Sequence, residues 1–177
     1  MESQGLFEAA NVPVSYCGIG KVNAASKAAE LIHKQGATFI LNLGTAGSAV
    51  FPTHTLVECS AVVQRDMDIT PLGFALGETP MDPISGRIDL EELFPHLPKG
   101  VCGTGDIFET GAPKVPCDLV DMEAYAIAKV CRQNGVGFAA VKYITDGSDH
   151  NAHNDWQENL VHGAKALLDV YGRWSRH

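Results

Sequence analysis

The stretch Phe138-Ala-Ala-Val-Lys-Tyr-Ile-Thr145, followed by Asp146-Gly147, is the most hydrophobic strand-like segment of the chain. Continuous apolar runs of this length are typical of strands that are buried on both faces of a sheet. A carboxyl group that directly follows such a strand is partly withdrawn from water, where it can hold a proton near neutral pH. The motif alone therefore allows two interpretations of Asp146, as an acid or as a turn residue before Gly147.

Strand-like and helix-like segments alternate along the rest of the chain. Strands are predicted at 12–17, 39–43, 55–64, 100–102 and 119–120, and helices at 23–34, 122–134 and 156–173. Residues 65–99 contain five of the nine prolines and predict long loops with one short helix near 89–94. We therefore predict a single domain over residues 1–177, a three-layer α/β/α fold around a central, mostly parallel or mixed sheet.

Composition excludes several classes of function. The net charge is −8 and the 13 basic residues are scattered, which argues against a nucleic-acid partner. No apolar run reaches the roughly 20 residues of a membrane span, and the start carries no secretory signal, so a cytoplasmic protein is expected. The five cysteines include no C-x-x-C pair, and the seven histidines show no ligand-like pairing, so no metal site and no cofactor are predicted.

Polar residues follow several of the predicted strands at short distance. Thr45, Asp106, Glu123 and Asp146 each come a few residues after an apolar run. In open α/β sheets the ligand crevice lies outside the carboxyl ends of the strands. Asp121 is explained as a helix N-cap, whereas Glu123 beside an apolar Met fits a half-buried pocket edge better. The sequence therefore predicts one ligand site built by several segments.

Six stretches of the chain resemble the nucleoside phosphorylase and nucleosidase superfamily, most closely the methylthioadenosine/S-adenosylhomocysteine nucleosidases. They are Gly18-Ile-Gly-Lys-Val-Asn-Ala24, Asn42-Leu-Gly-Thr-Ala-Gly47, Asp66-Met-Asp-Ile-Thr-Pro-Leu-Gly-Phe74, Gly103-Thr-Gly-Asp-Ile-Phe108, Val120-Asp-Met-Glu-Ala124 and Ile144-Thr-Asp146. They occur in the family's order. The resemblance implies an enzyme that cleaves an N-glycosidic bond of a purine-type nucleoside and needs no cofactor.

The resemblance also implies roles for individual residues. Asp146 protonates the base, Glu123 binds the ribose hydroxyls and Phe108 stacks on the base. The other residues implied to contact or support the nucleoside are Ile19, Thr45, Ala46, Gly47, Met122, Thr145 and Trp156, the last against the 5′ substituent. Relatives pair through the region of Leu72 and Phe74, which predicts a homodimer.

The sequence departs from the family pattern at its start. Members begin with a strand ending in Ala-Met-x-x-Glu, whose Glu activates the attacking water, whereas this sequence starts at Met1 and is expected to be N-terminally shortened. Strict register places Gln4 at the Glu position, and a two-residue shift assigns Glu2 as the catalytic base. Two further departures are Lys142 in place of Arg and Glu109 in place of an apolar residue.

Alternatives to hydrolysis remain open at this stage. A phosphorylase of the same fold needs a cation for phosphate, and the strand Phe39-Ile-Leu-Asn-Leu43 before the glycine-rich segment supplies none. Burying an unpaired phosphate dianion is costly, which favours water as the nucleophile. A non-catalytic nucleoside-binding protein is the second alternative, and an oxidoreductase, for which no cofactor fingerprint exists, is the third.

Overall fold

The computed structural model describes residues 3–147 and 152–175, with side chains from residue 159 onward in the second range. Its strands are β1 (Phe39–Gly47), β2 (Leu56–Gln64), β3 (Ile88–Asp89), β4 (Lys99–Thr104), β5 (Leu119–Asp121) and β6 (Gly137–Asp146). Its helices are α1 (Leu6–Ala9), α2 (Lys21–Gln35), η1 (Thr70–Leu72, a 3-10 helix), α3 (Ala124–Gln133) and α4 (Ala152–Trp174). No helix among the described residues is long and apolar enough to cross a membrane.

The strands form one mixed sheet in the order β3-β2-β4-β5-β1-β6. The pairs β1–β6, β2–β4 and β4–β5 are parallel, and β1–β5 and β2–β3 are antiparallel. A further antiparallel pairing joins β2 to β6, so that β2, β4, β5, β1 and β6 close into a ring. The strands run in two directions, β1 and β6 in one and β2, β4 and β5 in the other. The carboxyl ends of β1 and β5 meet where Gly47 pairs with Val120.

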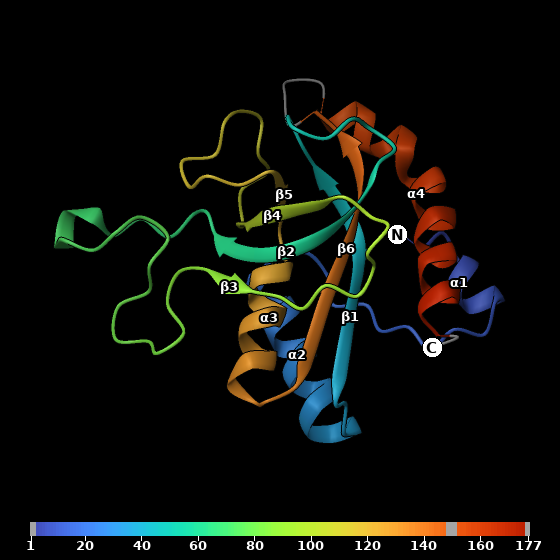
Figure 1. Cartoon of the computed structure of the whole chain (residues 1–177), viewed down its shortest axis with the longest axis horizontal. Helices are drawn as coiled ribbons and strands as arrows, with labels where there is room; N and C mark the ends of the chain where they lie inside the picture. The colour runs from blue at the N-terminus through green and yellow to red at the C-terminus, as the bar shows by residue number, and fades with distance from the viewer. Residues whose placement is uncertain (1–2, 148–151, 176–177) are drawn as a thin grey trace.

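Helices cover the sheet on two sides (Figure 1). Helices α2 and α3 pack against each other, and α3 also contacts β2, β4 and β6. Helix α4 lies on the other side against β6 and β1, and α1 packs on α4. Three layers result, and the predicted α/β class with a central mixed sheet is confirmed.

Helix α2 ends at Gly36 for a local reason. Gly36 has φ 70°, a left-handed conformation that glycine adopts without steric cost. Its amide donates to the carbonyl of Ile32, and the amide of Ala37 donates to that of Leu31. These two bonds satisfy carbonyls at the helix end and turn the chain toward β1.

Two predicted elements are absent from the structure, and a third prediction was too short. Residues 12–17 form no strand, because β1 and β6 already have neighbours on both sides in the ring and the segment lies largely exposed. Residues 89–94 form no helix, because the buried carboxylate of Glu58 accepts the amides of Leu93 and Phe94 and holds them in a loop. Strand β1 also continues as far as Gly47. The glycine-rich stretch that was expected to follow the strand therefore forms its C-terminal end, which lines the cavity.

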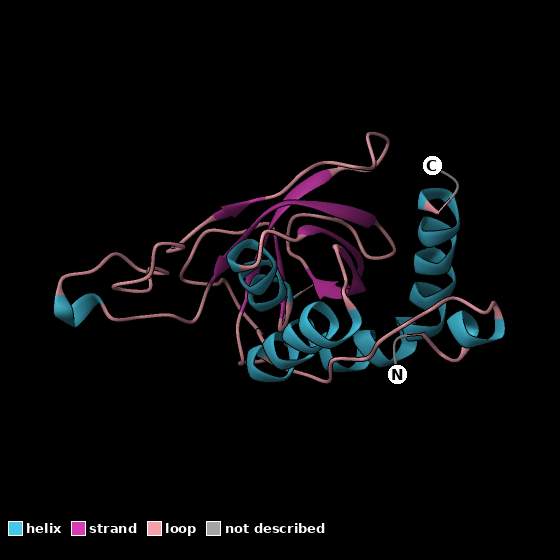
Figure 2. Cartoon of the chain, turned by 90° about the horizontal axis from the view of Figure 1, so that it is seen from below, coloured by secondary structure: helices cyan, strands magenta, loops and turns pink. Residues whose placement is uncertain are grey.

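Residues 66–87 leave the sheet after β2 and form a loop that projects well away from the rest of the molecule (Figure 2). We call this segment the projecting loop. Its apolar side chains Leu72, Phe74 and Met81 are exposed. Among the described elements, the short helix η1 is the only regular one within this loop. This agrees with the prediction of long loops here.

Candidate active site

A cavity of about 240 Å³ opens at the carboxyl ends of β1, β5 and β6 and is flanked by the segment that follows β4. Its lining residues are Ile19, Thr45, Ala46, Gly47, Arg65, Ile107, Phe108, Glu109, Val120, Asp121, Met122, Glu123, Thr145 and Asp146. The structure thus brings together most residues that the sequence analysis selected. Glu2 and the side chain of Trp156 lie outside the described residues. None of the described residues before Ile19 lines the cavity.

Asp146 is the last residue of β6 and its side chain is almost fully buried, with 5% of the residue exposed. The Thr145 hydroxyl donates to Asp146 Oδ2 at 2.9 Å. Helix α4 supports this strand end, because the Asn159 side-chain amide donates to the Thr145 carbonyl at 2.9 Å. The carboxyl group is therefore held in one orientation at the cavity wall.

Glu123 sits at the N-cap of α3 but does not use its carboxylate to cap the helix. Asp121 provides that bond instead, since its Oδ2 accepts the amide of Ala124 at 2.8 Å, as the sequence analysis expected. Glu123 Oε1 accepts the amide of Gly20 at 3.0 Å. A neighbouring residue thus performs the capping, and the Glu123 carboxylate lies in the cavity wall where it can meet hydroxyl groups.

A buried ion pair between Lys142 and Asp121 stabilises the cavity wall. Lys142 Nζ lies 2.8 Å from Asp121 Oδ2, and both side chains are almost completely buried. Burial is the largest single influence on the pKa of Lys142 and lowers it, but the neighbouring acidic groups, Asp121 first among them and Glu123 included, together outweigh burial and the pKa is raised. Burial likewise has the largest single effect on the pKa of Asp121 and raises it, but Lys142 and the hydrogen bonds from Thr104 and Ala124 together outweigh burial and that pKa is lowered. The Thr104 hydroxyl donates to Asp121 Oδ1 at 2.5 Å, so the pair is further fixed by β4.

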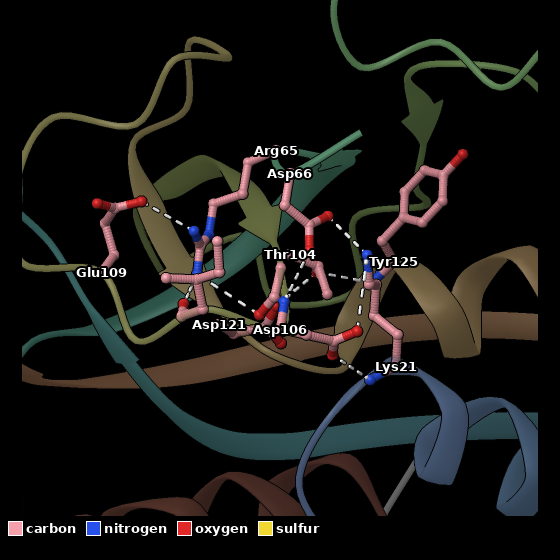
Figure 3. A network of polar contacts seen from close by, with 10 residues as sticks. Lys21, Arg65, Asp66, Thr104, Asp106, Glu109, Asp121 and Tyr125 are labelled. Atoms are coloured by element: carbon pink, nitrogen blue, oxygen red, sulfur yellow. Dashed lines mark hydrogen bonds and ion pairs between the residues drawn. The ribbon is translucent and has the colours of Figure 1, made fainter. Parts of the chain in front are cut away.

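A second polar network ties three loops together beside the cavity (Figure 3). Lys21 Nζ bonds Asp66 Oδ1 at 2.6 Å, and the amide of Asp106 donates to Asp66 Oδ2 at 2.8 Å. The amide of Lys21 donates to Asp106 Oδ1 at 2.8 Å. Asp106, expected to face the ligand, therefore holds the start of α2 and with it Gly20 and Ile19.

Sequence reasoning missed Arg65, which lines the cavity directly after β2. Arg65 Nη1 lies 2.8 Å from Glu109 Oε2, and Arg65 Nη2 donates to the carbonyl of Ile107 (Figure 3). The rule that selected Thr45 and Asp146, a polar residue directly after an apolar strand, applies equally to Arg65 and would have found it. Among the described side chains, no group of three or more His, Cys, Asp or Glu could hold a metal ion.

A mixed sheet between helices, with carboxylates from several strand ends facing one cavity, defines an α/β protein that binds a small molecule at its strand ends. The chain belongs to the Phosphorylase superfamily, whose model matches residues 3–172. The resemblance inferred from the six motifs is thereby confirmed.

Individual relatives agree with this family. A 5′-methylthioadenosine/S-adenosylhomocysteine nucleosidase of Anoxybacillus flavithermus is 30% identical over 181 residues, which cover 90% of this chain and 78% of the relative. The crystal structure of the Helicobacter pylori nucleosidase of that name, in complex with a pyrrolidine ligand, matches with a TM-score of 0.84 at 24% identity and covers 93% and 79% of the two chains. The futalosine hydrolase of Helicobacter pylori matches with a TM-score of 0.85, also at 24% identity and with the same coverage.

Proposed function

We propose that the protein hydrolyses the N-glycosidic bond of a purine-type nucleoside of the methylthioadenosine/S-adenosylhomocysteine kind, releasing free base and sugar. The observation that carries the proposal is the single cavity that joins Asp146, Glu123 and Phe108. The names of the relatives support the same reaction class.

In the proposed reaction Asp146 donates its proton to a nitrogen of the base as the bond between that base and the sugar breaks. The electron pair of the bond stays with the base, and water adds to the sugar carbon and loses a proton. Thr145 engages Oδ2 of Asp146, which fixes the plane of the carboxyl group toward the base. General acid catalysis of this kind contributes about 10²- to 10⁴-fold to a rate.

Glu123 binds the sugar in this scheme. A carboxylate accepts hydrogen bonds from two neighbouring hydroxyls, and the amide of Gly20 keeps Oε1 in place. The negative charge also stabilises the positive charge that develops on the sugar ring as the bond breaks. Met122 packs on the sugar and Phe108 stacks on the base.

Water rather than phosphate is the proposed nucleophile, because the cavity is acidic. Its lining includes the carboxylates of Glu109 and Glu123, the proton donor Asp146, and Asp121, which is paired with Lys142, and Arg65 is the one Lys or Arg among the residues that line it. Arg65 is already paired with Glu109. A phosphate dianion here would be desolvated beside like charges, which is unfavourable. Glu2 remains the proposed base for the water, whereas Gln4, the alternative that strict register suggested, is exposed and does not line the cavity.

The decisive experiment measures release of free base from a panel of purine nucleosides, with and without phosphate. Turnover that does not depend on phosphate supports the hydrolase. Turnover only with phosphate indicates a phosphorylase, and binding without turnover indicates a nucleoside-binding protein. Both outcomes would overturn the proposal.

A homodimer and a cytoplasmic location form part of the same proposal. The exposed apolar side chains of the projecting loop support the dimer, because several large apolar side chains exposed on one segment are typical of a surface where proteins associate. Cell fractionation tests the location, and sedimentation tests the dimer.

A further inference from the structure

The ion pair between Arg65 and Glu109 lies in the wall of the cavity and is not used by the proposed reaction. The Arg65 side chain is 4% exposed and that of Glu109 is 21% exposed. Charged pairs of this kind are costly to bury, so they need further hydrogen bonds or a role in binding. Arg65 finds such bonds at the carbonyls of Ile107 and, at 3.5 Å, of Gly105.

These contacts fix the backbone that precedes and carries Phe108. Arg65 binds the segment at residues 105, 107 and 109, so Phe108 is held between two anchored neighbours. Gly105 allows the approach, because a Cβ there would lie 3.0 Å from Arg65 Cζ. The guanidinium group thus packs against the segment that directly follows β4, and it sets the position of both Phe108 and Glu109.

Glu109 keeps one carboxylate oxygen for another donor. Oε2 accepts from Arg65, whereas Oε1 has no hydrogen-bond donor among the residues that the structure describes. Glu109 follows Phe108 directly and lines the same cavity. A base that stacks on Phe108 therefore presents the edge of its ring to a carboxylate, which accepts hydrogen bonds and donates none.

We propose that Glu109, positioned by Arg65, is a specificity-determining residue that accepts a hydrogen bond from an N–H group on the six-membered ring of the purine. The inference rests on the proposed function, because it requires a purine nucleoside in the cavity. A base without such an N–H leaves the carboxylate facing a ring nitrogen that also only accepts, which repels it. Sites built to bond a particular N–H reject analogues that lack it for this reason.

The test compares adenosine with purine riboside, which is adenosine without its 6-amino group. The kcat/KM ratio of the two nucleosides is measured for the wild type and for the double variant Arg65→Leu with Glu109→Leu. Dividing one ratio by the other cancels the different intrinsic reactivity of the two bases. We expect the preference for adenosine to fall about 10- to 100-fold in the double variant, the usual weight of a hydrogen bond to a charged group.

Further variants separate base recognition from a structural role. Replacing both charges with apolar groups avoids an unpaired buried charge and preserves the fold better than either single change. Arg65→Lys retains the cation and should keep most of the preference. Arg87→Met breaks an exposed ion pair with Asp89 and should leave the ratio unchanged.

The outcomes distinguish this inference from the proposed function. Turnover of both nucleosides with the same ratio in wild type and double variant would overturn the inference alone and leave the ion pair as a structural one. If the protein binds the two nucleosides without turning them over, the ratio of their dissociation constants, measured by calorimetry, is compared in place of the kcat/KM ratio. A protein that neither binds nor cleaves these two nucleosides or 5′-methylthioadenosine would overturn the proposed function and the inference with it.

Discussion

Asp146 carries the largest share of the proposed chemistry, and its substitution is the most direct test of the site. We expect Asp146→Asn to lower kcat by about 10²- to 10⁴-fold, because the amide fills the same space and bonds Thr145 but has no acidic proton to give. Thermal unfolding should be nearly unchanged, which separates lost chemistry from lost structure. A variant that keeps more than about a third of the wild-type rate would remove Asp146 from the mechanism.

Glu123 is expected to act on the sugar rather than on the base. Glu123→Gln keeps an acceptor for the Gly20 amide but removes the charge, and a hydrogen bond to a charged group is worth about 1.5–3 kcal/mol. The loss in kcat/KM should therefore be larger for ribosides than for 2′-deoxyribosides. Equal losses on both substrates would show that the carboxylate does not touch the 2′-hydroxyl.

Lys142 and Asp121 form a buried pair whose effect is on stability and on the geometry of the cavity floor. Lys142→Met leaves Asp121 buried without its counter-charge, which costs about 3–5 kcal/mol at neutral pH. In the wild type the pKa of Asp121 is lowered, so its contribution is present above the unfolded pKa of about 3.9 and is lost as pH falls through the lower folded pKa.

The pH dependence of Lys142→Met should therefore differ from that of the wild type. Without the cation, burial favours the protonated form of Asp121, so the deficit should shrink as pH falls from 7 toward 4. Urea unfolding at several pH values measures this. Lys27→Met breaks a half-exposed pair with Glu30 and serves as the control, with an expected cost below about 1 kcal/mol. A deficit independent of pH would contradict the assignment.

Helix α4 approaches β6 closely at one glycine. A Cβ on Gly163 would lie 2.9 Å from Tyr143 Cδ1, and the Tyr143 hydroxyl is itself bonded to His54 Nδ1 at 2.7 Å. Alanine favours helices over glycine by about 1 kcal/mol, but overpacking costs about 1–3 kcal/mol. We therefore expect Gly163→Ala to destabilise the fold in urea titrations. Gly172→Ala in the same helix meets no atom within 4 Å and should stabilise it, so the same sign for both would contradict this packing.

The elements that the sequence predicted well are those encoded by local pattern. Strands β1 and β6 are continuous apolar runs, and α2, α3 and α4 have apolar faces with helical spacing, so burial follows from residue order. The failures depend on distant residues. Segment 12–17 has strand-like residues but finds no partner strand, and segment 89–94 has helical spacing but its amides bind Glu58 from β2.

The same distinction applies to the cavity. Asp146, Glu123 and Thr45 were identified because each follows an apolar run, and the carboxyl ends of β1, β5 and β6 meet at the cavity. The pairing of Arg65 with Glu109 spans 44 positions and follows from the parallel pairing of β2 with β4, which no local pattern encodes. Tertiary pairing of this kind is the information that the sequence alone did not provide.

Closure of the strand ring limits how two copies of the molecule can associate. Strands β2 and β6 pair with each other, so the ring itself offers no open edge. Among the described strands, the edge strand is β3, which has only two residues. Association through strand pairing is therefore disfavoured. The projecting loop is the alternative surface for association, because it carries exposed apolar side chains. Its first residue, Asp66, is fixed beside the cavity by its bond to Lys21.

We expect the protein to sediment at about twice its monomer mass of 18.9 kDa. Leu72 and Phe74 are 74% and 40% exposed, and burying two such side chains in an interface contributes about 1.5–3 kcal/mol each. Leu72→Asp combined with Phe74→Asp places two charges at that position, which should dissociate the dimer to a monomer without unfolding it. Val161→Asp changes an apolar residue on α4 that is 60% exposed, between the values of Leu72 and Phe74, and should leave the mass unchanged. A wild-type protein that is monomeric and active at micromolar concentration, or a double variant that remains dimeric, would show that the projecting loop does not join two copies.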